Sequence, residues 1–322
     1  MTVSADGQNG AVSGPVTILD APAVAESGSA TSPCVEITED HEATVGRFRV
    51  RRALPRRGRR TVGAWCFADH MGPAQVTENS GLDIGPHPHI GLQTVTWLID
   101  GAVLHRDSLG SEQVIRPGQL NLMTAGGGVS HSEEATGAYR GDLQGIQLWV
   151  AQPEPTRHGP AAFEHHSDLP QVELDGAVAT VLVGALDGTA SPARHDTAIV
   201  GVDVDLPAGA TTLPLRPGFE YALIVLTGTV IVAGQRLAPG QLGYLGRGRN
   251  ELALQSAEPT RALLLGGEPW DEPILMWWNF VARTRSEIET AFHDWRDGTD
   301  RFGQVASPLP GIPVAPPYWT AG

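Results

Sequence analysis

Apolar residues along the chain fall in short runs, and turn-forming residues separate these runs. From Val35 onward the runs include FRVRRAL, TVGAWCFA, LQTVTWLI, GAVLHRD, QLNLMTA and GIQLWVA. Runs of this length, bounded by Gly, Pro, Asn or Asp, are typical of β-strands, because an amphipathic helix shows a longer segment with a period of about 3.6 residues. The pattern therefore predicts a β-sandwich or a small barrel.

A second block of strand-length runs starts near Asp175 and repeats the first. The segments LIDGAVLH and IRPGQLNLMTAG of the first block are similar to LTGTVIVA and LAPGQLGYLGRG in the second. Each copy has a turn glycine after a strand (Gly101, Gly228), then a hairpin, then a Pro-Gly pair that opens another strand. A duplicated unit with this order predicts an all-β fold of two tandem double-stranded β-helix barrels, the jelly roll of cupins.

A helical period appears near the end of the chain, in TRSEIETAFHDW. Thr284 and Glu287 fit a capping box at its start. The pattern predicts a short C-terminal helix that packs on a barrel. Its apolar face would consist of Ile288, Ala291, Phe292 and Trp295.

These patterns divide the chain into four parts. Residues 1–33 are rich in Gly, Ser and Ala without apolar periodicity, which predicts a disordered arm. The two predicted cupin domains span residues 34–170 and 171–303, and only the first contains candidate metal ligands. The Pro-rich segment 304–322 is predicted to be an extended tail.

Charge and composition narrow the function classes. The net charge of −14 disfavours direct nucleic-acid binding, since basic side chains supply most of the affinity for phosphates. One segment, Arg47 to Arg60, is basic; we expect a solvent-exposed strand face and hairpin turn there, with contact to an anion, RNA or an acidic partner as the alternative. The two cysteines, Cys34 and Cys66, predict no disulfide framework.

The chain also lacks a membrane or export signal in its sequence. No apolar run reaches the length that spans a bilayer, and the amino terminus has neither the basic start nor the apolar run of a secretory signal. We therefore expect a cytoplasmic protein without membrane contact. A monomer is expected too, because each barrel already has a neighbour that covers it.

Two pairs of side chains in the first block form a candidate metal site. His87 and His89 in GPHPH are two residues apart, as are His131 and Glu133 in VSHSE, so each pair projects to one face of an extended strand. A single strand histidine is more often a structural residue than a ligand. Two such pairs at matching strand positions favour a mononuclear site, whose three imidazoles and one carboxylate suit Fe, Mn, Ni, Cu or Zn.

The second block does not repeat these ligands. At the corresponding places it reads PLRPGFEY and RGRNELALQ, without histidine. Structural histidines would have no reason to occur at both ligand segments of one copy alone. The asymmetry therefore locates the function in the first barrel.

The motifs around these residues resemble those of the pirin family. The run from His87 to Glu134 contains HPH, HRDS, PGQ, TAG and HSE in the family's order, and ADHMGP, EPILMWWNFV and DWRDGTDRFG are similar to further motifs. The resemblance covers nearly everything from Arg47 to Gly303. One departure is Ile90–Gln93, where the family often has Arg-Gly-Phe-Glu, and we expect it to alter the pocket entrance and its charge.

The resemblance implies one iron in the first barrel, held by His87, His89, His131 and Glu133, and two alternative functions. Some similar proteins open the flavonol ring of quercetin with dioxygen, and we expect this activity on a small aromatic enol. Fe(II) is the first expectation for the metal, which would leave two positions for substrate and dioxygen. Glu133 is the predicted catalytic residue, as acceptor of the substrate proton.

The alternative is an iron-dependent, redox-sensing regulator without catalysis. Other similar proteins bind a transcription factor or a metabolic enzyme, and the Arg47 to Arg60 hairpin would be the contact surface here. The glycines of TAGGGVSH do not favour a phosphate loop, because they lead into a strand and not into a helix. The sequence contains no GxSxG motif, so this signature of a serine hydrolase is missing.

The remaining histidines and tryptophans support weaker predictions. His70 and His105 are candidates for hydrogen bonds to the metal ligands, with ordinary structural hydrogen bonds as an equal alternative. Solvent exposure is predicted for His165, His166 and His293, and burial in the core for Trp97 and Trp149.

Overall fold

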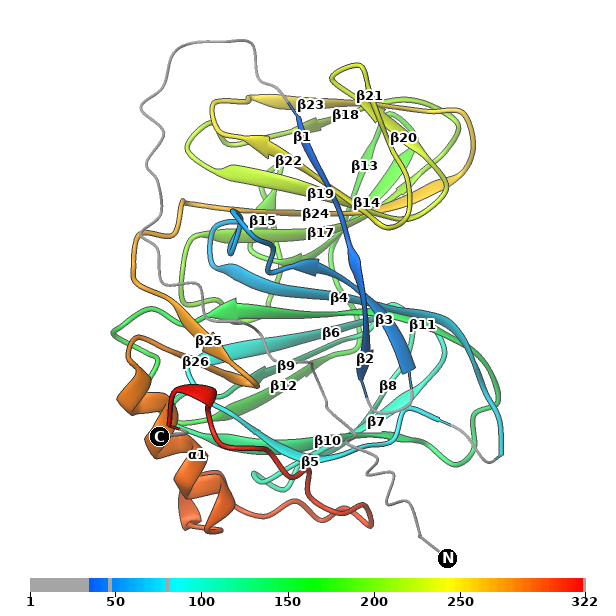
Figure 1. The fold of residues 1–322 in the computed structure, drawn as a ribbon. Coiled ribbons are helices and arrows are strands. Elements are labelled where there is room, and N and C mark those ends of the chain that lie inside the picture. Colours follow the sequence, from blue (N-terminus) through cyan, green and yellow to red (C-terminus); the bar gives the residue numbers. More distant parts are fainter. Residues whose placement is uncertain (1–34, 46–47, 79–80, 321–322) are drawn as a thin grey trace, which may run out of the picture.

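The structure, a computed structural model, describes residues 35–45, 48–78 and 81–320. Two β-barrels lie one above the other, and a helix, α1 (Arg285–Arg296), lies beside the first barrel (Figure 1). The predicted arm over residues 1–33 lies outside the described residues, as do Cys34 and Arg47.

The first barrel places a seven-stranded sheet against a four-stranded sheet. The larger sheet has the order β12-β9-β6-β11-β4-β3-β2 and the smaller one β5-β10-β7-β8. Their strands are β2 (His41–Val45), β3 (Phe48–Leu54), β4 (Trp65–Val76), β5 (Ile84–His89), β6 (Leu92–Asp100), β7 (Val103–Asp107), β8 (Glu112–Ile115), β9 (Leu120–Thr124), β10 (Val129–Ala135), β11 (Gly141–Ala151) and β12 (Ala162–His166).

The second barrel repeats this arrangement, with sheets β1-β22-β19-β24-β17-β14-β13 and β18-β23-β20-β21. The predicted all-β fold of two cupin barrels with a short C-terminal helix is confirmed. The strands are β1 (Glu36–Glu39), β13 (Gln171–Leu174), β14 (Ala177–Val183), β17 (Ile199–Leu206), β18 (Gly209–Pro214), β19 (Glu220–Thr227), β20 (Val230–Val232), β21 (Gln235–Leu237), β22 (Gln241–Gly246), β23 (Glu251–Ser256) and β24 (Thr260–Gly267), beside a small hairpin of β15 (Ala185–Leu186) and β16 (Thr189–Ala190).

Strand β1 joins the barrel that is distant from it in sequence. It pairs antiparallel with β22, from Glu36 opposite Tyr244 to Glu39 opposite Gln241. In the first barrel, β12 occupies the matching place beside β9. The sequence assigned residues 34–170 to the first barrel. In the structure β1 belongs to the second barrel instead, because it pairs with backbone groups at the edge of β22 that would otherwise be unpaired.

The C-terminal segment returns to the first barrel, although the sequence assigned residues up to 303 to the second. Strands β25 (Leu275–Trp277) and β26 (Phe280–Ala282) form a hairpin that contacts β5, and the Ile312 amide donates to the Pro86 carbonyl at 2.8 Å. The buried face of α1 packs against this hairpin, and the short helices η1 (Asp300–Phe302) and η2 (Tyr318–Thr320) complete the segment. Apolar contact on the first barrel explains this return.

Helix α1 begins as the capping pattern predicts. The Thr284 hydroxyl accepts a hydrogen bond from the Glu287 amide at 3.2 Å. Three of the four residues on the predicted apolar face, Ile288, Ala291 and Phe292, are buried.

The two seven-stranded sheets pack against each other and form an apolar core between the barrels. Trp65 donates from Nε1 to the carbonyls of Val200 and Gly266 at 3.2 and 3.1 Å. Trp97 donates to Asp203 Oδ2 at 3.0 Å. Trp97 therefore lies in the core, as predicted, and helps to join the two barrels.

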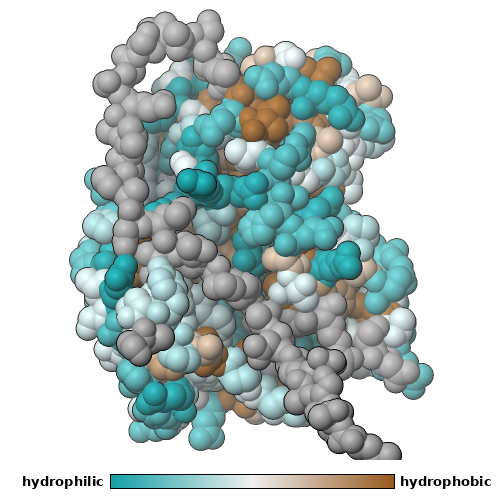
Figure 2. All heavy atoms as spheres, in the orientation of Figure 1, coloured by the Kyte–Doolittle hydropathy of each residue, from teal (hydrophilic) through white to brown (hydrophobic). Residues whose placement is uncertain are grey.

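The face of the molecule shown in Figure 2 is mostly hydrophilic, with small hydrophobic areas between polar side chains. Among the residues that the structure describes, no helix is long and apolar enough to cross a bilayer.

Candidate metal centre

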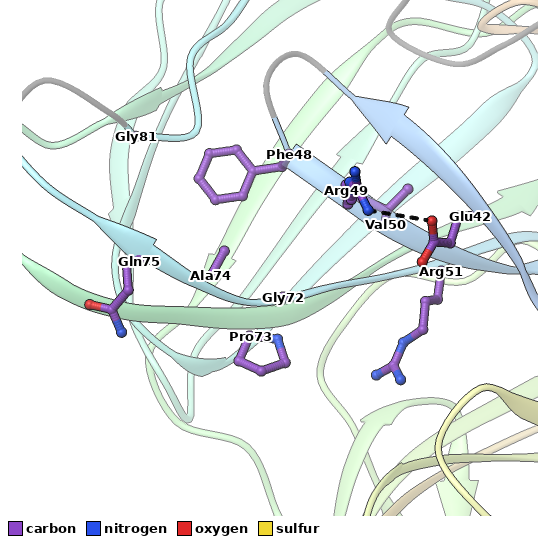
Figure 3. Close-up of a pocket in the computed structure, with 10 residues that line it drawn as sticks. All are labelled: Glu42, Phe48, Arg49, Val50, Arg51, Gly72, Pro73, Ala74, Gln75 and Gly81. Atoms are coloured by element: carbon purple, nitrogen blue, oxygen red, sulfur yellow. Dashed lines mark ion pairs between the residues drawn. The ribbon is translucent and has the colours of Figure 1, made fainter.

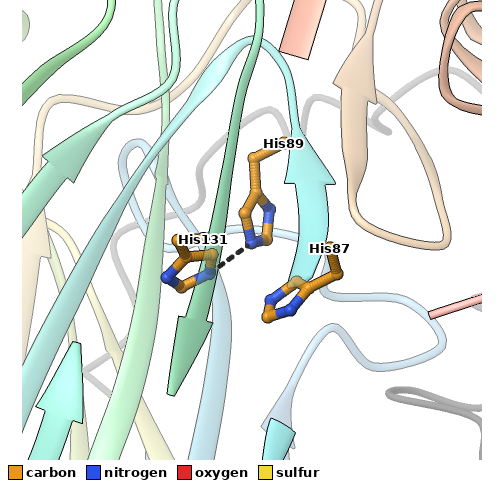
Figure 4. Close-up of side chains that lie close together, drawn as sticks. All are labelled: His87, His89 and His131. Carbon is orange, nitrogen blue, oxygen red and sulfur yellow. Dashed lines mark hydrogen bonds between the residues drawn. The ribbon is translucent and has the colours of Figure 1, made fainter. Parts of the chain in front are cut away.

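Strands β5 and β10 bring three histidines together. The two strands pair antiparallel with His131 opposite His87, so both histidines of β5 and His131 of β10 project into the barrel. One ring nitrogen of each histidine lies within 4.8 Å of the other two. Figure 4 shows the three imidazoles turned toward one another. All three side chains are buried.

The outward nitrogens of two of these imidazoles are held by backbone carbonyls. His87 Nδ1 lies 2.9 Å from the Gly85 carbonyl, and His89 Nδ1 lies 3.1 Å from the Asn279 carbonyl. A carbonyl oxygen only accepts, so in both rings Nδ1 carries the proton. Both Nε2 atoms therefore keep a free lone pair, which is the tautomer a metal ligand needs.

A relay through His105 assigns the same tautomer to the third imidazole. His105 Nε2 lies 3.1 Å from Asp107 Oδ2, and His105 Nδ1 lies 3.4 Å from His131 Nδ1. Since the carboxylate accepts from His105 Nε2, His105 Nδ1 is the acceptor and His131 Nδ1 the donor. The predicted hydrogen bond between His105 and one of the candidate ligands, His131, is thus present.

The charge state of the cluster favours a bound cation. The Nε2 atoms of His89 and His131 lie 3.0 Å apart, and the assigned tautomers direct two lone pairs at each other. Protonation is unfavourable, because burial lowers the pKa of His87 to about 4 and holds the pKa values of His89 and His131 well below the usual range. A metal ion between the nitrogens removes the repulsion without adding a proton, so the residues fit a metal.

Glu133 lines the same cavity but is not part of the compact three-histidine cluster. A register irregularity between His131 and Glu133 places Glu133 opposite Ile84. Its Oε1 atom lies 3.4 Å from the Thr96 hydroxyl, and burial raises its pKa to about 7. Its role as the fourth ligand stays a prediction.

The histidines line a small cavity of about 40 Å³. Its polar lining also contains Asp69, Gln147 and Asn279, and its apolar lining consists of Val45, Val50, Phe67, Met71, Ile84 and Trp149. Trp149, which the sequence assigned to the core, is buried and also faces this cavity, stacked on Phe67 with ring centroids 4.0 Å apart. The period-two alternation of residues 67, 69 and 71 could have indicated that they share a face.

A buried ion pair lies beside the cavity. Arg52 Nε and Nη2 each donate to a different oxygen of Asp69 at 2.7 Å, and both side chains are buried. The Arg52 guanidinium also lies 4.5 Å from the centre of the Phe67 ring. The pair keeps a carboxylate in the cavity wall without an unpaired charge.

Several other residues singled out in the sequence lie away from the cluster. His70 contacts Arg51 and Gln144, at 2.8 and 3.0 Å, and not a ligand. His293 is exposed on α1, as predicted, whereas His165 and His166 lie half-buried on β12 instead of in an exposed loop.

The segment Ile90–Gln93 also lies elsewhere than expected. Among the described residues, the lining of the cavity does not include it. Gln93 is buried and its Nε2 donates to the Thr124 hydroxyl at 3.1 Å. The departure from the family motif therefore changes a packed strand and not the cavity wall.

Comparisons with known proteins agree with this geometry. The family model described as Pirin matches residues 47–150, and the model of the Pirin C-terminal cupin domain matches residues 201–303. A Pseudomonas aeruginosa protein named "Putative quercetin 2,3-dioxygenase" is 47% identical over 85% of this chain and 87% of its own length. A "Pirin-like protein" of Caulobacter vibrioides is 37% identical over 79% of this chain and 90% of its own.

Solved structures show the same fold. Quercetin 2,3-dioxygenase from Acinetobacter baumannii matches with a TM-score of 0.84 and 44% identity, over 88% of this chain and 96% of that chain. The bacterial pirin YhhW from Escherichia coli, solved in complex with nickel(II), matches with a TM-score of 0.60 and 16% identity, over 74% of this chain and 100% of that chain.

Proposed function

Since this chain belongs to the pirin family, we propose that it is a metal-dependent oxygenase of the quercetin 2,3-dioxygenase type, which opens the ring of a flavonol or a similar aromatic enol with dioxygen. The observation that supports the proposal most directly is the convergence of three imidazoles whose Nε2 lone pairs face one another. The name of the A. baumannii relative supports the choice of reaction.

His87, His89 and His131 would hold one metal ion, with Glu133 as the fourth ligand. Fe(II) is our first choice, and Mn, Ni, Cu or Zn suit the same donors; the nickel complex of the E. coli relative supports this broader range. The bound metal would act as a Lewis acid toward the enol oxygen of the substrate and leave open positions for substrate and dioxygen.

The protein's own groups would orient the substrate and move its proton. Glu133 lines the cavity together with the three histidines and would accept the enol proton. Phe67 and Trp149 give the cavity an aromatic wall, which would contact the ring of a substrate once side chains have moved to admit it. Burial of the imidazoles excludes bulk water, which strengthens the polar contacts inside.

Metal analysis followed by a flavonol assay tests the proposal. Wild-type protein should retain stoichiometric metal, and His89→Ala should lose it, whereas His293→Ala, an exposed histidine on α1, should keep it. On admitting oxygen to an anaerobic mixture, wild type and His293→Ala should consume quercetin. Metal without turnover would favour the regulator, and absence of metal in wild type would refute the site.

The competing prediction, a regulator that binds a partner through Arg47 to Arg60, finds less support. Arg52 is buried against Asp69. Arg59 donates to Glu36 at 2.7 Å, and its guanidinium lies 3.2 Å from the centre of the Tyr244 ring. These guanidinium groups are already engaged within the chain, so less positive charge is available to a partner.

A further inference from the structure

The metal cavity is too small for a substrate of the proposed class. Its volume of about 40 Å³ has room for only a few water molecules, whereas an aromatic enol is much larger. Side chains must therefore move before such a ligand reaches the histidines.

A split between β3 and β4 brings the surface close to the cavity. The two strands pair from Leu54 opposite Ala68 to Val50 opposite Met71. Beyond Val50 and Met71 the two strands no longer pair, although β4 keeps its other partner β11, for example at Ala74 opposite Leu143, and β3 keeps its other partner β2.

The strands diverge at Gly72, which has a φ of +75°. A Cβ atom at Gly72 would meet the Leu143 carbonyl oxygen at 2.1 Å, so a larger residue cannot occupy this close approach without displacing the backbone. The close approach of β4 to β11 at this point therefore depends on glycine at position 72.

A groove of about 490 Å³ lies in this split (Figure 3). Val50 lines the groove and also lines the metal cavity. Its side chain is buried, and its cross-strand partner Met71 lines the cavity beside it. Val50 therefore lies where the groove and the cavity adjoin.

The groove suits a planar aromatic anion. Phe48, Pro73 and Ala74 supply apolar lining. The charged lining consists of Arg49, Arg51 and Glu42, and Arg51 also lies 3.8 Å from Asp40, so the positive charge at the groove comes mainly from Arg49. Arg49 pairs only loosely with Glu42, at 3.7 Å and with both side chains largely exposed, so its charge stays available at the mouth. A deprotonated enol combines a flat apolar body with a negative oxygen and matches both features.

We propose that the split between β3 and β4 is the entrance to the metal cavity for a planar aromatic enolate, and that Val50 is its gate. This inference rests on the proposed function, because it takes the metal cavity as the destination of the ligand. Val50 acts through access alone: it touches no reacting atom, and its size sets the rate of entry and the width of ligand that passes.

Ligand entry can be measured without turnover. Metal-loaded protein is mixed anaerobically with 4-nitrocatechol, a coloured bidentate enol, and the absorbance change on binding is followed by stopped flow. Val50→Ala should raise the association rate constant by about tenfold and Val50→Phe should lower it by a similar factor, since a gate controls entry. Metal content should stay unchanged in both variants.

Val103→Ala provides a matched control. Val103 is buried in the same apolar cluster as Val50 but is absent from the lining of both the groove and the cavity. It should bind the probe at the wild-type rate. Equal rates in wild type, Val50→Ala and Val50→Phe would overturn the gate, whereas absence of any probe spectrum in metal-loaded wild type would overturn the proposed function instead.

A thiol at the gate gives a second measurement that does not depend on a large side chain. Val50→Cys in a Cys34→Ser background leaves Cys66 as the other thiol, which is fully buried with a pKa raised by burial to about 12. Methyl methanethiosulfonate should label the introduced thiol from the groove and slow probe binding, and bound 4-nitrocatechol should protect this thiol. Labelling without any effect on probe binding would contradict the entrance.

Discussion

The two barrels share one strand plan but fill it differently. In the first barrel, His87 on β5 lies opposite His131 on β10. At the matching place in the second barrel, Leu213 on β18 lies opposite Leu252 on β23, and both are buried in an apolar core. One barrel thus uses its interior for apolar packing, and the other gives up part of that packing to hold polar ligands.

The fold by itself therefore does not create the site. Buried apolar side chains stabilise the second barrel directly. In the first barrel, buried imidazoles and a carboxylate cost desolvation free energy unless hydrogen bonds and a cation compensate it.

The largest effect should come from giving the first barrel the interior of the second. The double variant His87→Leu/His131→Leu should lose metal binding entirely, because one imidazole and one carboxylate remain. Its thermal stability should match or exceed that of chelator-treated wild type, since apolar pairs replace desolvated polar groups. Elemental analysis and calorimetry measure the two parts; a variant that retains stoichiometric metal would contradict the assigned ligands.

A reciprocal change in the second barrel should affect stability and leave the metal in place. Leu252→Ala removes a buried side chain opposite Leu213 and should lower the free energy of unfolding by about 2–5 kcal/mol. Urea denaturation with metal analysis of the folded protein checks this. Loss of metal from folded Leu252→Ala would show that the two interiors are not independent.

Metal affinity should depend on pH through Glu133. Protons compete with the metal; the pKa of His87 is about 4, whereas that of Glu133 is about 7. Between about pH 5 and pH 7 the affinity should therefore rise with pH by up to about 100-fold as Glu133 loses its proton, and then level off. Nickel titrations at several pH values test this, and Glu133→Gln should remove most of the rise.

The smallest effect should come from the hydroxyl that contacts Glu133. The Thr96 hydroxyl lies 2.9 Å from Gln147 Oε1 and 3.4 Å from Glu133 Oε1. Thr96→Val removes both contacts while keeping the side-chain shape, and should weaken metal binding by about tenfold, the lower end of the usual range for such partners, because the contact with Glu133 is long. Thr96→Ser should restore the affinity. Competition with a chelating dye measures both variants.

The local pattern was sufficient to predict the two barrels and the histidine cluster. Turn residues and strand-length runs indicate each barrel, and the two-residue spacing of His87 and His89 places both imidazoles on one face. These features depend on neighbours in sequence. The pairing of β5 with β10, which brings in His131, follows from the known order of strands in this type of barrel.

Other parts of the site depend on contacts that a local pattern does not encode. Asp69 faces the cavity because of the register of β4, and its ion pair with Arg52 joins two strands. Asn279 lies beyond the whole second barrel in sequence and reaches the site only because the C-terminal segment folds back. The relation of Glu133 to the histidines depends on a bulge, which two-residue spacing alone does not predict.

The amino-terminal strand β1 pairs with the second barrel, and the C-terminal segment packs on the first. The order of residues along the chain therefore does not show where the protein can be divided into two independent parts. A cut near residue 170 would leave β22 without β1, and it would remove the Asn279 carbonyl that orients His89. Neither half would contain everything that its own barrel uses. The histidine cluster therefore depends on the C-terminal segment as well as on the first barrel, and loss of structure around Asn279 would release the ring of His89.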